Sequence, residues 1–138
     1  MKLFRLILLP LSALWYAISG IRTWLYGKGL LRRRRFRLPV FVVGNLSTGG
    51  TGKSPHAELL ARRMMEQGYR TALLSRGYGR RTKGFLEVSQ HDSARRTGDE
   101  PLMLKRALPE ATVAVCENRA RGIRQLMRRF RPQVIVLD

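Results

Sequence analysis

Residues 47–54 read STGGTGKS, a glycine-rich stretch between a short apolar run and a segment with helical periodicity. Glycines after a strand let backbone N–H groups turn toward an anion, and the positive end of the following helix adds to that attraction. This order predicts a phosphate-binding loop at the start of an α/β domain. The predicted nucleotide-binding residues are Ser47, Thr48, Gly49, Gly50, Thr51, Gly52, Lys53 and Ser54.

Two residues of this loop carry the chemistry expected of it. The Lys53 ammonium would reach the β- and γ-phosphates of ATP, and the Ser54 hydroxyl would bind Mg²⁺. One position departs from the usual pattern, because Ser47 stands where the motif has its first glycine. The alternative is a glycine-rich turn that binds no nucleotide, but the strand before it and the helix after it favour the phosphate site.

From residue 38 to the end of the chain, strand and helix patterns alternate. Short β-branched runs predict buried strands over residues 40–43, 70–75, 112–116 and 132–138. Helical spacing predicts helices over residues 53–67, 99–108 and 119–130. The alternation predicts an α/β fold of the P-loop NTPase type, a mostly parallel sheet with flanking helices. Because the chain stops on its last predicted strand, we expect it to be a fragment of a longer protein.

The first 37 residues differ in kind from the rest, so we predict two parts, residues 1–37 and 38–138. Residues 6–21 read LILLPLSALWYAISGI, an apolar run that is shorter than the roughly 20 residues that cross a bilayer. Its tryptophan and tyrosine, followed by LRRRRFR at residues 31–37, favour a helix in the membrane interface beside anionic lipid. A membrane span, a core helix, a signal peptide and a solvated basic linker are the alternatives.

The composition constrains the partners. There are 27 lysines and arginines against 9 acidic residues, a formal net charge of +18. This excess predicts an anionic partner: nucleic acid, a membrane surface or a phosphorylated substrate. A missing acidic portion of the protein is the plainer explanation. The single cysteine, Cys116, lies in an apolar run and is expected to be a buried thiol in a reducing compartment.

Three further stretches supply candidate site residues. Asp138 ends an apolar strand, where a carboxylate can hold Mg²⁺ beside a P-loop. Asp99 is a good helix N-cap, or a base that accepts the proton of an attacking hydroxyl. Arg76 and Tyr78 follow a predicted strand at the edge where ligands bind in open α/β sheets, so they are candidates for substrate contacts. A flexible basic turn is the alternative for this last stretch.

Taken together, these stretches resemble the tetraacyldisaccharide 4′-kinase family of lipid A biosynthesis. The resemblance rests on VVGNLSTGGTGKSP at residues 42–55, LLSRGYGRR at 73–81, TGDEP at 97–101 and VIVLD at 134–138. With the apolar N-terminus it covers nearly the whole chain. In that family the position of Ser47 is commonly serine or threonine, which accounts for the departure from the glycine pattern.

The resemblance implies that ATP and Mg²⁺ phosphorylate the 4′-hydroxyl of a membrane-embedded tetraacylated glucosamine disaccharide 1-phosphate. Lys53 would contact the phosphates of ATP and assist transfer, Asp99 would be the base, and Ser54 and Asp138 would hold the metal. A second acidic residue and a histidine partner of the base are expected beyond this chain, which alone should lack activity. The N-terminal helix would place the enzyme at the cytoplasmic face of the bacterial inner membrane, as a peripheral or monotopic protein.

Two other functions remain open from the residues alone. The net charge of +18 is compatible with a P-loop ATPase that acts on nucleic acid. We expect no nucleic acid, because the aromatic residues gather in the N-terminal segment instead of alternating with the basic loops. The second alternative is a membrane adaptor without enzymatic activity, whose P-loop is degenerate.

Overall fold

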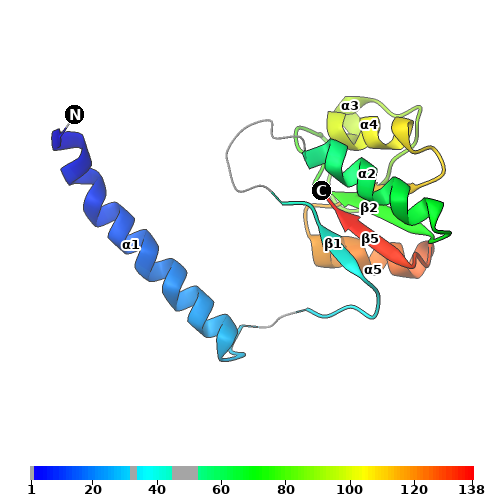
Figure 1. Cartoon of the computed structure of the whole chain (residues 1–138). Coiled ribbons are helices and arrows are strands. Elements are labelled where there is room, and N and C mark those ends of the chain that lie inside the picture. Colours follow the sequence, from blue (N-terminus) through cyan, green and yellow to red (C-terminus); the bar gives the residue numbers. More distant parts are fainter. Residues whose placement is uncertain (1, 32–33, 45–52) are drawn as a thin grey trace. The chain divides into compact units, whose positions relative to one another are not determined.

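Two units make up the chain, Met1–Arg35 and Phe36–Asp138. The computed structural model describes residues 2–31, 34–44 and 53–138, with side chains from residue 9 onward (Figure 1). The first unit contains one helix, and the second contains a sheet with helices around it. The sequence predicts the division after residue 37, two residues later.

The helix of the first unit is α1 (Lys2–Gly27), which continues through Pro10. Its apolar side chains are open to solvent, and the exposed fractions of Trp15 and Tyr16 are 72% and 81%. Four residues at helical spacing, with Ser12 between them, line a shallow apolar hollow of about 420 Å³; they are Leu11, Leu14, Trp15 and Ile18. Among the described residues, no helix is both long enough and apolar enough to cross a bilayer.

The second unit is built on a five-stranded sheet with the order β1-β5-β2-β4-β3. Its strands are β1 (Val40–Val42), β2 (Thr71–Ser75), β3 (Leu86–Glu87), β4 (Thr112–Val115) and β5 (Val134–Leu137). Neighbouring strands are parallel except for β3, which is antiparallel to β4. The predicted α/β fold with a mostly parallel sheet is therefore confirmed.

Helices cover both faces of this sheet (Figure 1). One face carries α2 (Lys53–Glu66) and α4 (Asp99–Ala107), with the short α3 (Ala94–Thr97) beside α4. The other face carries α5 (Arg119–Arg129). This arrangement follows from the length of the connections, since parallel neighbours need a crossover segment that can form a helix.

The alternation of side chains along each strand divides the core into two apolar layers. Leu73, Val113 and Val136 belong to the layer that includes α2 and α4. Leu74 and Ile135 belong to the layer on the α5 side. All five are essentially inaccessible to solvent, as expected for central strands that are covered on both faces.

Three sequence predictions need correction. The first strand was expected to be buried, but β1 is an edge strand, and the exposed fractions of Phe41 and Val42 are 42% and 62%. Asp99 is not the N-cap of its helix: Gly98 occupies that position, and Asp99 is the first helical residue. Between β2 and α4 the sequence predicts neither a strand nor a helix, yet this segment contains β3 and α3.

Candidate active site

Four segments meet at the carboxyl edge of the parallel strands. β5 ends just before Asp138, β2 ends just before Arg76, and β4 leads through a short connection into Arg119 at the start of α5. Helix α2 begins with Lys53 and Ser54. Ligands of open α/β sheets bind at this edge, and the N-terminus of α2 adds a partial positive charge to it.

A pocket of about 380 Å³ opens at this edge. The described residues that line it are Lys53, Ser75, Arg76, Tyr78, Glu100, Arg119 and Asp138. Four of the predicted site residues are thus brought together, although they are far apart in the sequence: Lys53, Arg76, Tyr78 and Asp138. The lining holds three basic side chains and two carboxylates, so the pocket has a net positive charge and suits an anion with an attached cation.

The carboxylate of Asp138 interacts with Ser54, Glu100 and Lys53. The Ser54 hydroxyl donates to Oδ2 of Asp138 over 3.5 Å, which brings two hard oxygen donors together. Burial raises the pKa of the Asp138 carboxyl, and the negative charge of Glu100 raises it further. The ammonium of Lys53 opposes this rise. A cation bound beside Asp138 would therefore stabilise the ionised form of its carboxylate.

Arg119 lies against the same strand end. Its Nη2 donates to the main-chain oxygen of Asp138 over 2.9 Å. Its Nε is buried and has no hydrogen-bond partner among the described residues. Burial lowers the pKa of the Arg119 guanidinium, and the like charge of Arg76 lowers it further. A bound anion would accept a hydrogen bond from the Nε–H of Arg119 and would offset the repulsion between Arg119 and Arg76.

Sequence reasoning did not single out Arg119 or Glu100. Arg119 follows β4 in the same way that Arg76 follows β2, so the rule of the carboxyl edge could have identified it. Glu100 stands beside Asp99 in the stretch TGDEP, and only the turn of α4 shows that Glu100 is the one that lines the pocket.

Some predicted residues lie elsewhere. Asp99 is exposed at the start of α4 and is not part of the pocket lining, although its neighbour Glu100 is. The predicted nucleotide-binding residues from Ser47 to Gly52 lie outside the described residues. Within the described part of the chain, no group of three or more histidines, cysteines or carboxylates is arranged to hold a metal ion. Cys116 is buried and free, as predicted.

A larger hollow, about 510 Å³, runs along the outer surface of α2. It is lined by His56, Leu59, Leu60, Arg62, Arg63 and Glu66, none of which was predicted to belong to a site. Its charges are arranged as an ion pair between Arg63 and Glu66 on the helix surface. The convergence of strand ends, a helix start and three basic side chains favours the smaller pocket at the carboxyl edge.

Comparisons with known proteins identify relatives of this chain. Residues 4–138 match the family described as tetraacyldisaccharide-1-P 4′-kinase. The chain is 46% identical over 139 residues to a tetraacyldisaccharide 4′-kinase of Flavobacterium johnsoniae, and 45% identical over 138 residues to one of Parabacteroides distasonis. The crystal structure of LpxK from Aquifex aeolicus in complex with ATP superposes with a TM-score of 0.82 at 38% identity.

These similarities cover nearly all of the chain but only part of each relative. The chain is matched over 100% and 98% of its length by the two bacterial kinases, and it spans 41% and 37% of theirs. For the Aquifex aeolicus structure the two shares are 97% and 43%.

Proposed function

This chain belongs to the tetraacyldisaccharide-1-P 4′-kinase family, and from that premise we propose what the whole protein does. It transfers the γ-phosphate of ATP to the 4′-hydroxyl of a tetraacylated glucosamine disaccharide 1-phosphate, a step of lipid A biosynthesis. The ATP complex of the Aquifex aeolicus LpxK supports ATP as the phosphate donor.

The observation that carries this proposal is the set of charges at the carboxyl edge of the sheet. Lys53, Arg76 and Arg119 line one pocket at the N-terminus of α2. Phosphoryl transfer requires positioning and neutralisation of charge on the phosphate oxygens rather than covalent chemistry by the protein. Three cations and a helix N-terminus supply that neutralisation, and the predicted phosphate-binding loop leads directly into Lys53.

Ser54 and Asp138 fit the role of Mg²⁺ ligands. Their side-chain oxygens lie 3.5 Å apart, and both are hard donors of the kind that Mg²⁺ prefers. Mg²⁺ in kinases is held by one or two carboxylates together with the phosphates of the nucleotide, so a small protein ligand set is enough. Bound there, Mg²⁺ would neutralise charge on the β- and γ-phosphates.

The acceptor side of the site is assigned to Asp99, Arg76 and Tyr78. Asp99 begins α4 one residue before Glu100, with its side chain exposed, so it is available to a hydroxyl that enters from solvent or from a lipid surface. Tyr78 is 93% exposed at the mouth of the pocket and can pack against a sugar. In this proposal Asp99 orients the 4′-hydroxyl and accepts its proton.

Helix α1 supplies the membrane contact of the proposal. Its exposed leucines and tryptophans would enter the interface of the membrane, on the cytoplasmic face of the bacterial inner membrane. The guanidinium of Arg22 lies 5.8 Å from the ring of Tyr26, and the ammonium of Lys28 lies 5.9 Å from that of Trp24. Cation–aromatic pairs of this kind suit the level of the lipid headgroups.

A phosphorylation assay on the whole protein tests the proposal. Lys53→Ala should lower the rate of ATP-dependent phosphorylation of the lipid disaccharide by about a hundredfold or more, because it removes a cation from the transferring phosphate. The control is Lys83→Ala, whose side chain is exposed outside the pocket. Full activity of Lys53→Ala would refute the assignment. ATP hydrolysis that nucleic acid stimulates, without lipid phosphorylation, would favour the nucleic-acid ATPase, and failure to bind ATP would favour the adaptor.

A further inference from the structure

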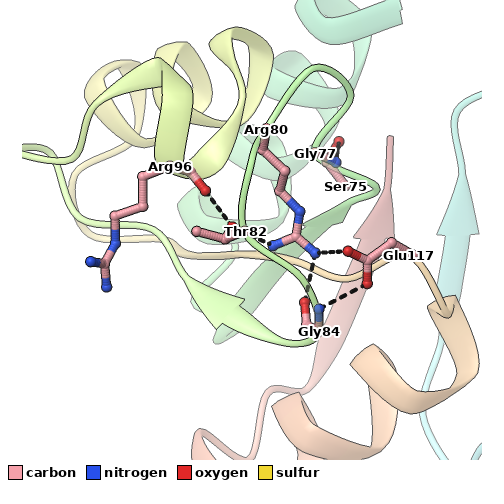
Figure 2. Close-up of polar contacts among 7 residues, drawn as sticks. All are labelled: Ser75, Gly77, Arg80, Thr82, Gly84, Arg96 and Glu117. Atoms are coloured by element: carbon pink, nitrogen blue, oxygen red, sulfur yellow. Dashed lines mark hydrogen bonds and ion pairs between the residues drawn. The ribbon is translucent and has the colours of Figure 1, made fainter.

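The buried side chain of Arg80 makes hydrogen bonds inside the loop that follows β2. The side chain of Arg80 is 2% exposed, although the stretch LLSRGYGRR is strongly basic. Figure 2 shows its guanidinium inside the loop, among acceptors from several segments. Nη2 donates to the main-chain oxygen of Gly84 over 2.6 Å and to Oε1 of Glu117 over 2.5 Å. Nη1 donates to the hydroxyl of Thr82 over 3.3 Å.

Arg80 also supports the backbone that leads to Asp99. A Cβ added to Gly77 would lie 2.5 Å from Cδ of Arg80, so the arginine stem packs directly on the Gly77 backbone. Gly77 in turn lies against Gly98, where an added Cβ would be 3.3 Å from the Gly77 Cα and 3.0 Å from the oxygen of Tyr78. Both glycines have positive φ, 70° and 93°, which lets the two backbones approach each other. Asp99 follows Gly98 directly.

The same guanidinium reaches the connection that leads to Arg119. Its partner Glu117 lies between β4 and α5, two residues before Arg119. Oε2 of Glu117 also accepts from the backbone N–H of Gly84 over 3.1 Å (Figure 2). The Thr82 hydroxyl, which accepts from Arg80, donates to the oxygen of Arg96 at the end of α3 over 2.5 Å. One side chain thus links three segments that border the pocket.

Stability alone does not explain this arrangement. Glu117 is 54% exposed, so solvent screens part of its attraction to Arg80 and limits what this ion pair contributes to stability. The Nε of Arg80 is buried and has no hydrogen-bond partner among the described residues, which costs free energy. A lysine could not replace it, because only the planar fork of arginine reaches several fixed acceptors at once.

We propose that Arg80 is a positioning residue. It fixes the relative positions of four side chains of the site: Arg76, Tyr78, the base candidate Asp99 and the cation Arg119. The inference rests on the proposed kinase function, which gives these residues their roles. Arg80 itself is enclosed by protein groups, and it acts through the backbone of residues 77 and 98 and through Glu117. Loss of Arg80 leaves Lys53 and α2 in place but allows these four side chains to shift.

The test is Arg80→Met in the whole protein. A misplacement of about 1 Å costs about a hundredfold in rate, so we expect kcat for lipid phosphorylation to fall by about ten- to a hundredfold. ATP affinity, measured with a fluorescent ATP analogue, should fall by a smaller factor than kcat, because Lys53 and α2 stay in place while Arg76 and Arg119 shift. The matched control is the neighbouring Arg81→Met, whose side chain is exposed and whose activity should stay at that of the unsubstituted protein.

A second control separates positioning from folding. Leu126→Ala removes a fully buried side chain about two turns along α5 from Arg119, so it destabilises the fold away from the Arg80 contacts. Its activity and that of Arg80→Met are compared at a temperature where both proteins have the same folded fraction. Arg80→Met should be much slower than this control, and its amides in residues 76–84 and 98–100 should exchange hydrogen faster. Equal activity of the two variants with equal exchange, or unchanged kcat in Arg80→Met, would overturn the proposal. If the unsubstituted protein phosphorylates no lipid, the proposed function fails, and the exchange comparison alone decides the role of Arg80.

Discussion

Replacement of Gly98 by alanine is the sharpest structural test of how the site is assembled. Gly98 has φ 93° and ψ 155°, a conformation that is essentially restricted to glycine and costs any other residue about 1–3 kcal/mol. The new Cβ would also lie 3.0 Å from the oxygen of Tyr78 and 3.3 Å from the Cα of Gly77. Both neighbours are backbone atoms that cannot rotate away, so we expect Gly98→Ala to lower the free energy of unfolding by about 2–4 kcal/mol.

Gly79→Ala is the matched control for this substitution. Gly79 has φ 76° in the same loop, but an added Cβ there would have no heavy atom within 4 Å. The cost of Gly79→Ala should therefore be the backbone term alone, about 1–2 kcal/mol. The two positions share a positive φ, so the extra cost of Gly98→Ala reports the extended ψ of Gly98 together with the close approach of residues 77 and 98.

Urea unfolding followed by far-ultraviolet circular dichroism measures both values, with unchanged slopes as the condition for comparing them. Gly98→Ala should be the less stable variant by about 1 kcal/mol or more. If its free energy of unfolding lies within about 0.5 kcal/mol of that of Gly79→Ala, the contact between the β2 loop and the start of α4 is not as described. The placement of Asp99 would then lose its structural basis.

Three further variants have clear expected outcomes. Because burial raises the pKa of Asp138 in the folded state, its contribution to stability is present at low pH and is lost as the pH rises through that raised pKa. Asp138→Asn should therefore raise the free energy of unfolding at neutral pH without nucleotide by about 1 kcal/mol or less, and the gain should vanish near pH 3.8; lower stability at neutral pH would contradict this. Gly122→Ala would place Cβ 2.7 Å from Leu74, so overpacking of about 1–3 kcal/mol outweighs the helix propensity gain of about 1 kcal/mol, and a higher melting temperature would refute it. Replacing Trp15 and Trp24 together by serine should lower the affinity for anionic phosphatidylglycerol vesicles, measured by co-sedimentation, by about tenfold or more. An unchanged affinity would exclude α1 as the membrane contact.

Local patterns are sufficient to predict most of the second unit. β2, β4 and β5 are buried runs with β-branched residues, and a loop or helix of distinct composition follows β2 and β4. Since ligands of open α/β sheets bind at the carboxyl edge, the positions of Lys53, Arg76 and Asp138 next to predicted strand ends indicate a shared site. Those three residues do line one pocket.

Features that depend on strand order could not be predicted in the same way. An apolar run such as residues 40–43 has the same composition in a central strand and at an edge. The exposure of β1 follows from its place at the edge of the sheet, where β5 is its one neighbour among the described strands. Arg119 reaches the pocket because β4 lies beside β2, a pairing that composition does not encode. A turn with two glycines and three arginines has the composition of a flexible surface loop, and the burial of Arg80 depends on acceptors from a distant segment.

The most direct test of the central claim is the transfer of label from γ-labelled ATP to the lipid disaccharide by the whole protein, with the position of the new phosphate determined by NMR. The account predicts a labelled product phosphorylated at the 4′-hydroxyl and a loss of label of about a hundredfold or more in Lys53→Ala. Release of the label as inorganic phosphate, with no labelled lipid in the presence of the disaccharide, would contradict it.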